Sequence, residues 1–236
     1  MKRRTRWHDM VAMLLGGLIM FAPAGRVVAE TVELRAAHFD KRHRVDVTQS
    51  PWLILGRLQT ELGTRCTGFL IAPNVVMTAA HCLWLEESGH YIRPHSVHFL
   101  RAYHRGHFAA EARAIHIIIA PGFDPTRAIA TAQADRATIV LERPMVTSAD
   151  IPPVLTPRAG DDAMIVGYEQ DFPEIARGDQ NCHVTAVSGR LIHHNCTTTH
   201  GASGAPIMIR RDGKWGIGGI TTLSDRRSGG AGVGLW

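Results

Sequence analysis

The stretch Met77-Thr78-Ala79-Ala80-His81-Cys82 places a histidine beside a cysteine directly after an apolar run. Far downstream, Gly201-Ala202-Ser203-Gly204-Ala205-Pro206 places a serine between small residues, where a substrate can approach the backbone closely. Between the two stretches, Asp135 precedes the apolar run 137–141. A serine hydroxyl becomes a nucleophile when a base takes its proton, and an imidazole oriented by a carboxylate is such a base. The chain therefore carries the residue types of a catalytic triad in the order His, Asp, Ser.

This order and these two motifs resemble the chymotrypsin/trypsin-like serine proteases. Residues 40–52 look in particular like the start of the bacterial glutamyl-endopeptidase-like secreted members. The resemblance implies an all-β fold of two six-stranded antiparallel β-barrels with the active site in the cleft between them. It implies a secreted serine endopeptidase that works through an acyl-enzyme and needs no cofactor. His81 would be the base, Asp135 the residue that orients it and Ser203 the nucleophile, with the oxyanion hole formed by the N–H groups of Gly201 and Ser203.

Other assignments of the triad were weighed against this one. Asp124 is a rival for Asp135, but a proline follows it directly, which is typical of a turn-forming aspartate. An α/β-hydrolase needs its histidine after the serine, and no histidine follows Ser203. A subtilisin-like enzyme needs its aspartate before His81, where only the polar segment 30–50 offers one.

The resemblance also implies a substrate pocket lined by Thr197, Thr198, Thr199, His200, Gly219, Ile220 and Thr221. Thr197 stands at the pocket floor, where an aspartate would make a trypsin, so cleavage after Lys or Arg is not expected. Thr198 matches the threonine that glutamyl endopeptidases use, whereas their pocket histidine aligns with Gly218 here. We expect acidic or small uncharged side chains in the pocket, with His200 as a substitute for the missing histidine.

Ala202 departs from the animal members of the family, which carry there an aspartate that pairs with the newly freed N-terminus. A clean Ile-Val-Gly-Gly start is also missing upstream. The zymogen switch of those enzymes is therefore not implied for this chain. Bacterial glutamyl-endopeptidase-like enzymes lack the same aspartate, so the departure gives no reason to expect a loss of activity.

Many short apolar runs separated by turn residues, with little helical periodicity, predict an all-β barrel or sandwich. The proline-rich residues 143–160 resemble a crossover between an N-terminal barrel at about 51–145 and a C-terminal barrel at about 155–236. The runs are 52–60, 66–71, 75–79, 96–103, 114–120, 137–142, 163–168, 183–188, 190–194, 206–210, 215–222 and 232–236.

The N-terminus has the pattern of a secretory signal peptide: a basic start, an apolar core at 11–21 and small residues at 27–29. We expect cleavage near Ala29 and a secreted or periplasmic protein without a membrane span. Residues 30–50 are polar and are expected to form an N-terminal arm or a short propeptide.

The formal net charge is +5, but residues 1–29 hold five basic side chains and one acidic one. The mature chain is therefore near neutral, and its composition gives no reason to expect a nucleic acid partner. The expected partner is a protein or peptide substrate, and the expected state is a monomer.

The cysteines at 66, 82, 182 and 196 all lie in the mature chain, where an even count in an exported protein indicates disulfides. We favour the local pairs Cys66–Cys82 and Cys182–Cys196, since each brackets a strand–turn–strand stretch. The alternative is a metal site, because Cys182, His193, His194, Cys196 and His200 cluster in sequence. Zinc favours closer ligand spacing and thiolates, so we expect no metal.

Two further functions remain open on sequence alone. A member of this fold can be catalytically inactive and serve as a binding protein, particularly if the oxyanion loop is collapsed. The histidine content of 14 residues would also suit a secreted metal-binding protein.

Overall fold

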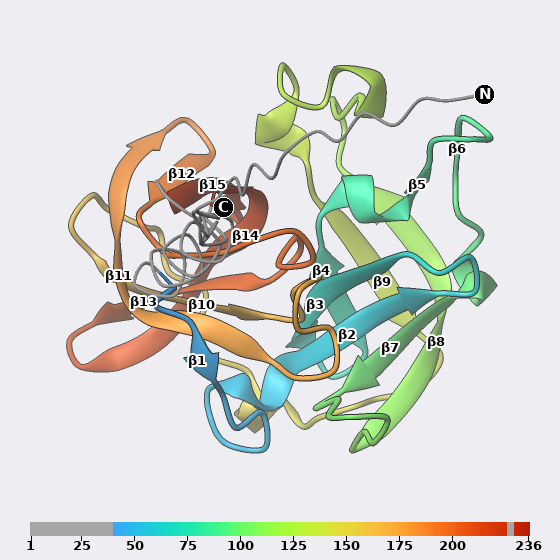
Figure 1. Cartoon of the computed structure of the whole chain (residues 1–236), viewed down its shortest axis with the longest axis horizontal. Coiled ribbons are helices and arrows are strands. Elements are labelled where there is room, and N and C mark those ends of the chain that lie inside the picture. Colours follow the sequence, from blue (N-terminus) through green and yellow to red (C-terminus); the bar gives the residue numbers. More distant parts are fainter. Residues whose placement is uncertain (1–39, 226–228) are drawn as a thin grey trace, which may run out of the picture. The chain divides into compact units, whose positions relative to one another are not determined.

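The computed structural model describes residues 40–225 and 229–236. The expected signal peptide, its cleavage site and the first part of the expected arm lie outside the described residues. Two six-stranded antiparallel β-barrels account for most of the described chain (Figure 1). The predicted fold class is therefore confirmed. The described residues contain no helix that is long and apolar enough to cross a membrane.

The first barrel closes in the strand order β2-β3-β4-β9-β8-β7. Strand β9 alternates between buried and partly buried residues along its whole length, because one of its faces points into the barrel. Phe69, Phe99 and Ile139 are fully buried in this interior. The strands are β2 (Leu55–Thr60), β3 (Arg65–Ala72), β4 (Val75–Thr78), β7 (Val97–Arg101), β8 (Ala110–Ile119) and β9 (Ala137–Leu141).

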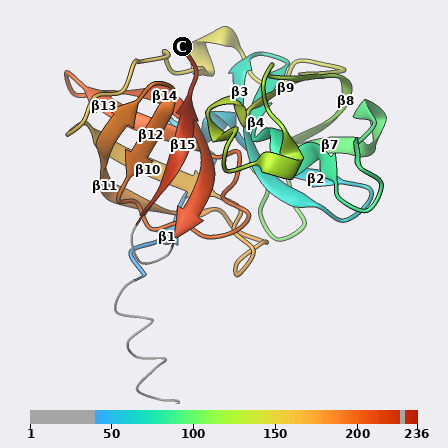
Figure 2. The ribbon, with the colours of Figure 1, turned by 90° about the horizontal axis from the view of Figure 1, so that it is seen from above.

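The second barrel follows the order β11-β10-β13-β14-β15-β12 and closes through the pairing of β11 with β12. Ile165, Val184 and Ile207 pack in its interior. Figure 2 shows the two barrels side by side. The strands are β10 (Asp162–Gly167), β11 (Arg177–Ser188), β12 (Leu191–His194), β13 (Pro206–Arg211), β14 (Lys214–Asp225) and β15 (Gly229–Gly234).

Short elements complete the fold. A small hairpin pairs β5 (Trp84–Leu85) with β6 (His90–Tyr91), and β1 (His43–Arg44) adds to the edge of β11. The 3₁₀ helices are η1 (Trp52–Ile54), η2 (Ala80–Leu83), η3 (Pro94–Ser96), η4 (Pro125–Arg127), η5 (Ala132–Ala134) and η6 (Ser148–Asp150).

Residues 40–50 pack into the domain, which differs from the expected domain start at residue 51. Val45 and Val47 are buried in the core, and the N–H of Val45 donates to the carbonyl of Ala176 at 3.1 Å. The Arg42 side chain is buried as well. The packing of this segment was not predicted from its sequence, because its few buried residues alternate with exposed charged ones.

Each predicted apolar run overlaps a strand, and the largest difference lies at β11. This strand begins at Arg177, whereas the sequence predicts a run from 183. Its first half contains Asp179, which is buried. The Asp179 carboxylate accepts hydrogen bonds from the N–H groups of Asn181 and Thr197, which compensate for its lost hydration. A buried but satisfied carboxylate does not show in an apolar pattern.

Candidate active site

His81 and Asp135 lie beside each other at one end of the paired strands β4 and β9 of the first barrel. His81 lies in η2 just after β4, and Asp135 lies just before β9, which pairs with β4 through Thr78 and Ala137. The Nδ1 atom of His81 lies 2.7 Å from Oδ2 of Asp135, and the His81 backbone N–H donates to Oδ1 at 3.0 Å. Because a carboxylate oxygen only accepts, Nδ1 carries the hydrogen and Nε2 is left as the acceptor.

Asp135 is 4% exposed, whereas Asp124 caps a turn at the surface. Asp124 accepts from the N–H of Thr126 and forms an ion pair with Arg127 at 2.8 Å. These contacts lower the pKa of Asp124 to about 2, the hydrogen bond from the Thr126 side chain being the largest cause. The structure thus places the aspartate preferred from the sequence beside His81 and its rival in a turn.

Ser203 lies in a loop whose small residues are required by close backbone packing. Gly201 and Gly204 both have positive φ, at 91° and 84°. A Cβ at Gly201 would lie 2.6 Å from the carbonyl oxygen of Tyr168, and one at Gly204 would overlap Thr67 and Thr78. We name residues 199–203 the oxyanion loop.

The oxyanion loop of the second barrel is held by Thr67 of the first barrel. The N–H of Thr67 donates to the carbonyl of Ser203 at 2.9 Å, and its hydroxyl donates to the carbonyl of Gly201 at 2.9 Å. Thr67 is itself held by β4, since the hydroxyl of Thr78 donates to the Thr67 carbonyl at 2.8 Å. Thr67 was not among the residues predicted from the sequence, where its position after Cys66 was the available signal.

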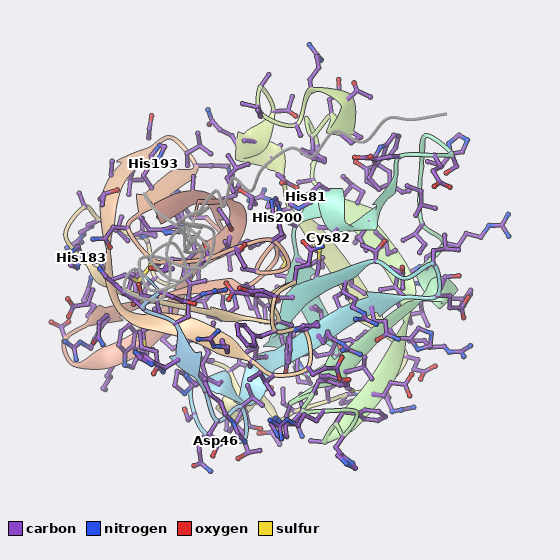
Figure 3. All side chains as sticks on the ribbon, viewed as in Figure 1. Asp46, His81, Cys82, His183, His193 and His200 are labelled. Carbon is purple, nitrogen blue, oxygen red and sulfur yellow. A yellow bond between two sulfur atoms is a disulfide. The ribbon has the colours of Figure 1, made fainter. Side chains whose placement is uncertain are left out.

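The Cys66–Cys82 disulfide links this support to the histidine, because Thr67 follows Cys66 and His81 precedes Cys82. The Sγ atom of Cys82 lies 3.8 Å from the carbonyl oxygen of Ser203. Figure 3 labels His81, Cys82 and His200 in this view. Within the described residues no hydrogen bond joins the Ser203 hydroxyl to the His81 ring.

Some N–H groups along the oxyanion loop are bonded within the domain and others are not. Ala202 donates to the carbonyl of Thr199 at 3.1 Å, and Gly204 donates to the carbonyl of Thr221 at 2.8 Å. The N–H groups of Gly201 and Ser203 have no acceptor among residues 40–225 and 229–236. These are the two donors that the sequence analysis assigns to an oxyanion hole.

Two of the expected pocket residues offer unused hydroxyl groups. Thr198 and Thr221 are fully or almost fully buried, and neither hydroxyl has a partner in the described part of the chain. Thr197 is engaged through its backbone, since its N–H donates to Asp179 at 3.0 Å. The structure therefore leaves unpartnered hydroxyl groups at Thr198 and Thr221.

The other expected pocket residues have different positions. Ile220 is fully buried in the core, and Gly219 lies against Ile192 and Val233. Thr199 donates its N–H to Glu169, and His200 is exposed. His200 lines a cavity of about 370 Å³ together with Arg57, Gly63, Arg65, Tyr168, Gln170, Pro173 and Gly201.

Gly218, which is expected to align with the pocket histidine of glutamyl endopeptidases, and Thr221 have different surroundings on β14. Gly218 lies against Pro157 and Ile209, whereas Thr221 is the β14 residue bonded to the Ser203 loop. Three residues separate them, and the pairing of β13 with β14 is irregular at Gly218, between the pairs Ile207–Gly219 and Met208–Ile217, which sequence spacing alone does not reveal.

His194, the last residue of β12, is a buried histidine. From the sequence it was considered only as a possible metal ligand. It is 2% exposed, and neither ring nitrogen has a partner within the described residues. Burial, followed by the charge of His193, lowers the pKa of His194 to about 4. The ring packs against Gly230 of β15, where a Cβ would lie 3.0 Å from its Cε1.

Both predicted disulfides are present, Cys66–Cys82 and Cys182–Cys196. One ligand atom each of Cys66, His81 and Cys82 lies within 4.8 Å of the others. Their sulfurs are bonded to each other and are not thiolates, so this group does not have the donors of a zinc site. The same holds for Cys182 and Cys196.

Comparison with known proteins decides the family. The family model named Trypsin matches residues 40–232. The chain belongs to the trypsin family. A solved structure of a Glu endopeptidase in complex with MPD has the same fold, with a TM-score of 0.69 and 18% identity over 83% of this chain and 91% of that one. A comparison with curated proteins gave no match. The resemblance to trypsin-like serine proteases is thereby confirmed, the Glu endopeptidase shares the fold, and a serine protease hydrolase is the activity that this trypsin-family domain supports.

Proposed function

We propose that this trypsin-family protein is an exported serine endopeptidase that acts through Ser203, His81 and Asp135. The observation that carries the proposal is the double contact of the Asp135 carboxylate, which binds both the ring and the main chain of His81. This contact fixes the tautomer in which Nε2 can accept a proton. Two free N–H groups and a serine lie in the adjacent loop.

In this mechanism Nε2 of His81 takes the hydroxyl proton of Ser203 as Oγ attacks the carbonyl carbon of the scissile peptide bond. The N–H groups of Gly201 and Ser203 stabilise the oxyanion, a contribution of about 3–4 kcal/mol for one such donor. His81 then returns the proton to the leaving amine, which gives the acyl-enzyme. Water, activated by the same imidazole, hydrolyses the ester and regenerates Ser203.

For specificity we propose a preference for acidic or small uncharged residues on the acyl side of the cleaved bond. The unpartnered hydroxyls of Thr198 and Thr221 are suited to donate to a carboxylate or carbonyl. Asp179, the nearby carboxylate, already accepts from the N–H groups of Thr197 and Asn181, which leaves little to attract a Lys or Arg side chain.

The two disulfides suit an oxidising compartment, which supports the proposed export through a signal peptide ending near Ala29. Because residues from 40 on pack into the domain, we propose that the mature enzyme keeps them and that any propeptide ends before Asp40. A monomer that binds a protein or peptide substrate is the simplest arrangement for this site.

The test is labelling of the exported protein with a fluorophosphonate probe, in wild type and in the variants Ser203→Ala and His81→Ala. We expect labelling in wild type only, since the reaction needs an activated serine. If folded wild type is not labelled, the catalytically inactive binding protein becomes the better description.

A further inference from the structure

Glu169 is a buried carboxylate that the proposed reaction does not use. It follows β10 and is 1% exposed. One oxygen, Oε1, accepts from the backbone N–H of Thr199 at 3.0 Å, and the other, Oε2, accepts from Nη1 of Arg42. A carboxylate loses most of its hydration on burial, so its charge has to be compensated by such contacts. Glu169 thus joins the start of the oxyanion loop to the N-terminal arm.

Arg42 is 2% exposed and uses its guanidinium fully. Nε and Nη2 bind the two oxygens of Asp40, each at 2.8 Å. Nη2 and Nη1 also bind the two oxygens of Asp171, at 2.7 and 3.1 Å. Burial lowers the pKa of Arg42, but hydrogen bonds with Asp40 and Asp171 and the charge of Glu169 outweigh it and raise that pKa above its ordinary value. Arg42 is therefore a permanent buried cation.

Two bidentate aspartates already hold Arg42 in place, so Glu169 is not needed to anchor the arm. Its second oxygen is instead bound to the loop backbone. Burial raises the pKa of Glu169 to about 7, although Arg42 and the Thr199 N–H lower it. The charged form that accepts both hydrogen bonds thus depends on Arg42.

The contacts continue from Glu169 to the free donors of the oxyanion loop. Thr199, held by Glu169, accepts from the N–H of Ala202 at 3.1 Å, which closes the turn that contains Gly201. Gln170 follows Glu169 in the sequence, and its N–H donates to the carbonyl of His200 at 2.7 Å. The peptide plane that carries the free N–H of Gly201 is therefore oriented directly by Gln170. The plane that carries the N–H of Ser203 follows the turn from Thr199 to Ala202, which Glu169 holds at its start.

We propose that Glu169 is a positioning residue for the oxyanion loop, and that the buried guanidinium of Arg42 keeps it in its working, ionised state. The inference rests on the proposed function for its catalytic consequence. Glu169 touches no reacting atom. It fixes the turn from Thr199 to Ala202, and the direction of two N–H donors follows from that turn. A displacement of about 1 Å at such a site is enough to reduce turnover about 100-fold.

The experiment compares Glu169→Gln with Asp40→Asn in the otherwise unchanged mature protein. Both substitutions remove one negative charge next to Arg42, but only Glu169 contacts the loop. The first measurement is amide hydrogen exchange of the peptide that covers 199–204. We expect at least tenfold faster exchange at Thr199 and Ala202 in Glu169→Gln and wild-type exchange in Asp40→Asn. Equal exchange in the two variants would overturn the proposal, whether or not the protein is a protease.

The second measurement is steady-state cleavage of a peptide, normalised to the folded fraction. For Glu169→Gln we expect kcat to fall at least tenfold with KM within about threefold, because the hole acts on the transition state. Asp40→Asn should retain kcat within about twofold. Arg42→Lys, which keeps the charge but loses the fork, should lie between them and serves if Glu169→Gln fails to fold. Unchanged kcat in Glu169→Gln and Arg42→Lys would refute the positioning role, whereas an inactive wild type with fast loop exchange only in Glu169→Gln would refute the proposed function alone.

Discussion

The backbone N–H of Thr67 donates a 2.9 Å hydrogen bond to the carbonyl of Ser203, across the boundary between the two barrels. The hydroxyl of Thr67 adds two further bonds on the same side, to the carbonyl of Gly201 and from the N–H of Tyr168 at 2.8 Å. The position of the proposed nucleophile is thus set by a residue of the opposite barrel.

Replacing Thr67 by valine keeps the shape of the side chain and removes its hydroxyl. Two buried backbone groups then lose their partner, at about 1–3 kcal/mol each, so we expect the free energy of unfolding to fall by about 2–4 kcal/mol. Peptidase activity should fall at least tenfold because Gly201 is no longer held. Urea unfolding and initial rates measure the two effects. Thr67→Ser, which retains the hydroxyl, is the control and should preserve most of both.

Gly204 should tolerate alanine far less well than Gly213, although both have positive φ, at 84° and 74°. A Cβ at Gly213 meets nothing within 4 Å, so Gly213→Ala should cost only the backbone strain of about 1–2 kcal/mol. A Cβ at Gly204 overlaps Thr67 and Thr78, and we expect a loss of about 3 kcal/mol or more together with loss of activity. Similar unfolding curves for the two variants would contradict the packing described here.

The two disulfides close loops of similar length, with sequence separations of 16 and 14 residues. Removing either pair by serine substitution should therefore destabilise the protein by about 3 kcal/mol. The effect on turnover should differ, because only Cys66 and Cys82 flank Thr67 and His81. We expect kcat of the folded enzyme to fall much more in the Cys66/Cys82 double variant. Equal kcat values would show that the first disulfide stabilises the fold without positioning the site.

The buried His194 should make stability depend on pH. Since burial lowers its pKa to about 4, the unfolded chain binds a proton below about 6.5 and the folded chain only below about 4. The free energy of unfolding should fall by about 3 kcal/mol as the pH is lowered through this window and level off below it. In His194→Asn this part of the pH dependence should disappear. His193→Asn, at an exposed neighbouring residue whose charge is a smaller cause of the lowered pKa than burial, should retain most of it.

A peptide library with a varied residue before the cleaved bond tests the specificity of the pocket. We expect acidic or small uncharged residues to be preferred and Lys or Arg to be among the poorest. Thr198→Val and Thr221→Val should raise KM for the acidic peptides more than for an alanine peptide, because each removes one buried hydroxyl donor. Dominant cleavage after Lys or Arg in wild type would refute this specificity.

The local pattern of the sequence predicted an all-β fold, whereas the two barrels and the pairing of His81 with Asp135 were implied by the resemblance of the motifs to a known family. Strands appear as apolar runs between turn residues, and Asp135 stands directly before such a run whereas Asp124 precedes a proline. Chain order then placed the serine motif. Each of these features can be read within a window of about ten residues.

The supports of the loop could not be predicted in this way. Arg42 and Glu169 are polar residues separated by 127 positions, and nothing near either one indicates that it is buried. The role of Thr67 depends on contacts 134 positions away. The pocket was only partly predictable, because an irregular strand ladder shifts which residues of β14 reach the loop.

The long separation of these contacts has a consequence for the order of folding. Contacts between distant residues form late, because the chain loses loop-closure entropy before they stabilise it. The bonds from Arg42 to Asp171 and from Thr67 to Gly201 span 129 and 134 positions, so each needs chain from both barrels. A growing or partly exported polypeptide that lacks the second barrel has neither bond. Proteolytic activity would then appear only after both barrels have been exported and have folded. An incomplete chain would not cleave proteins of the producing cell.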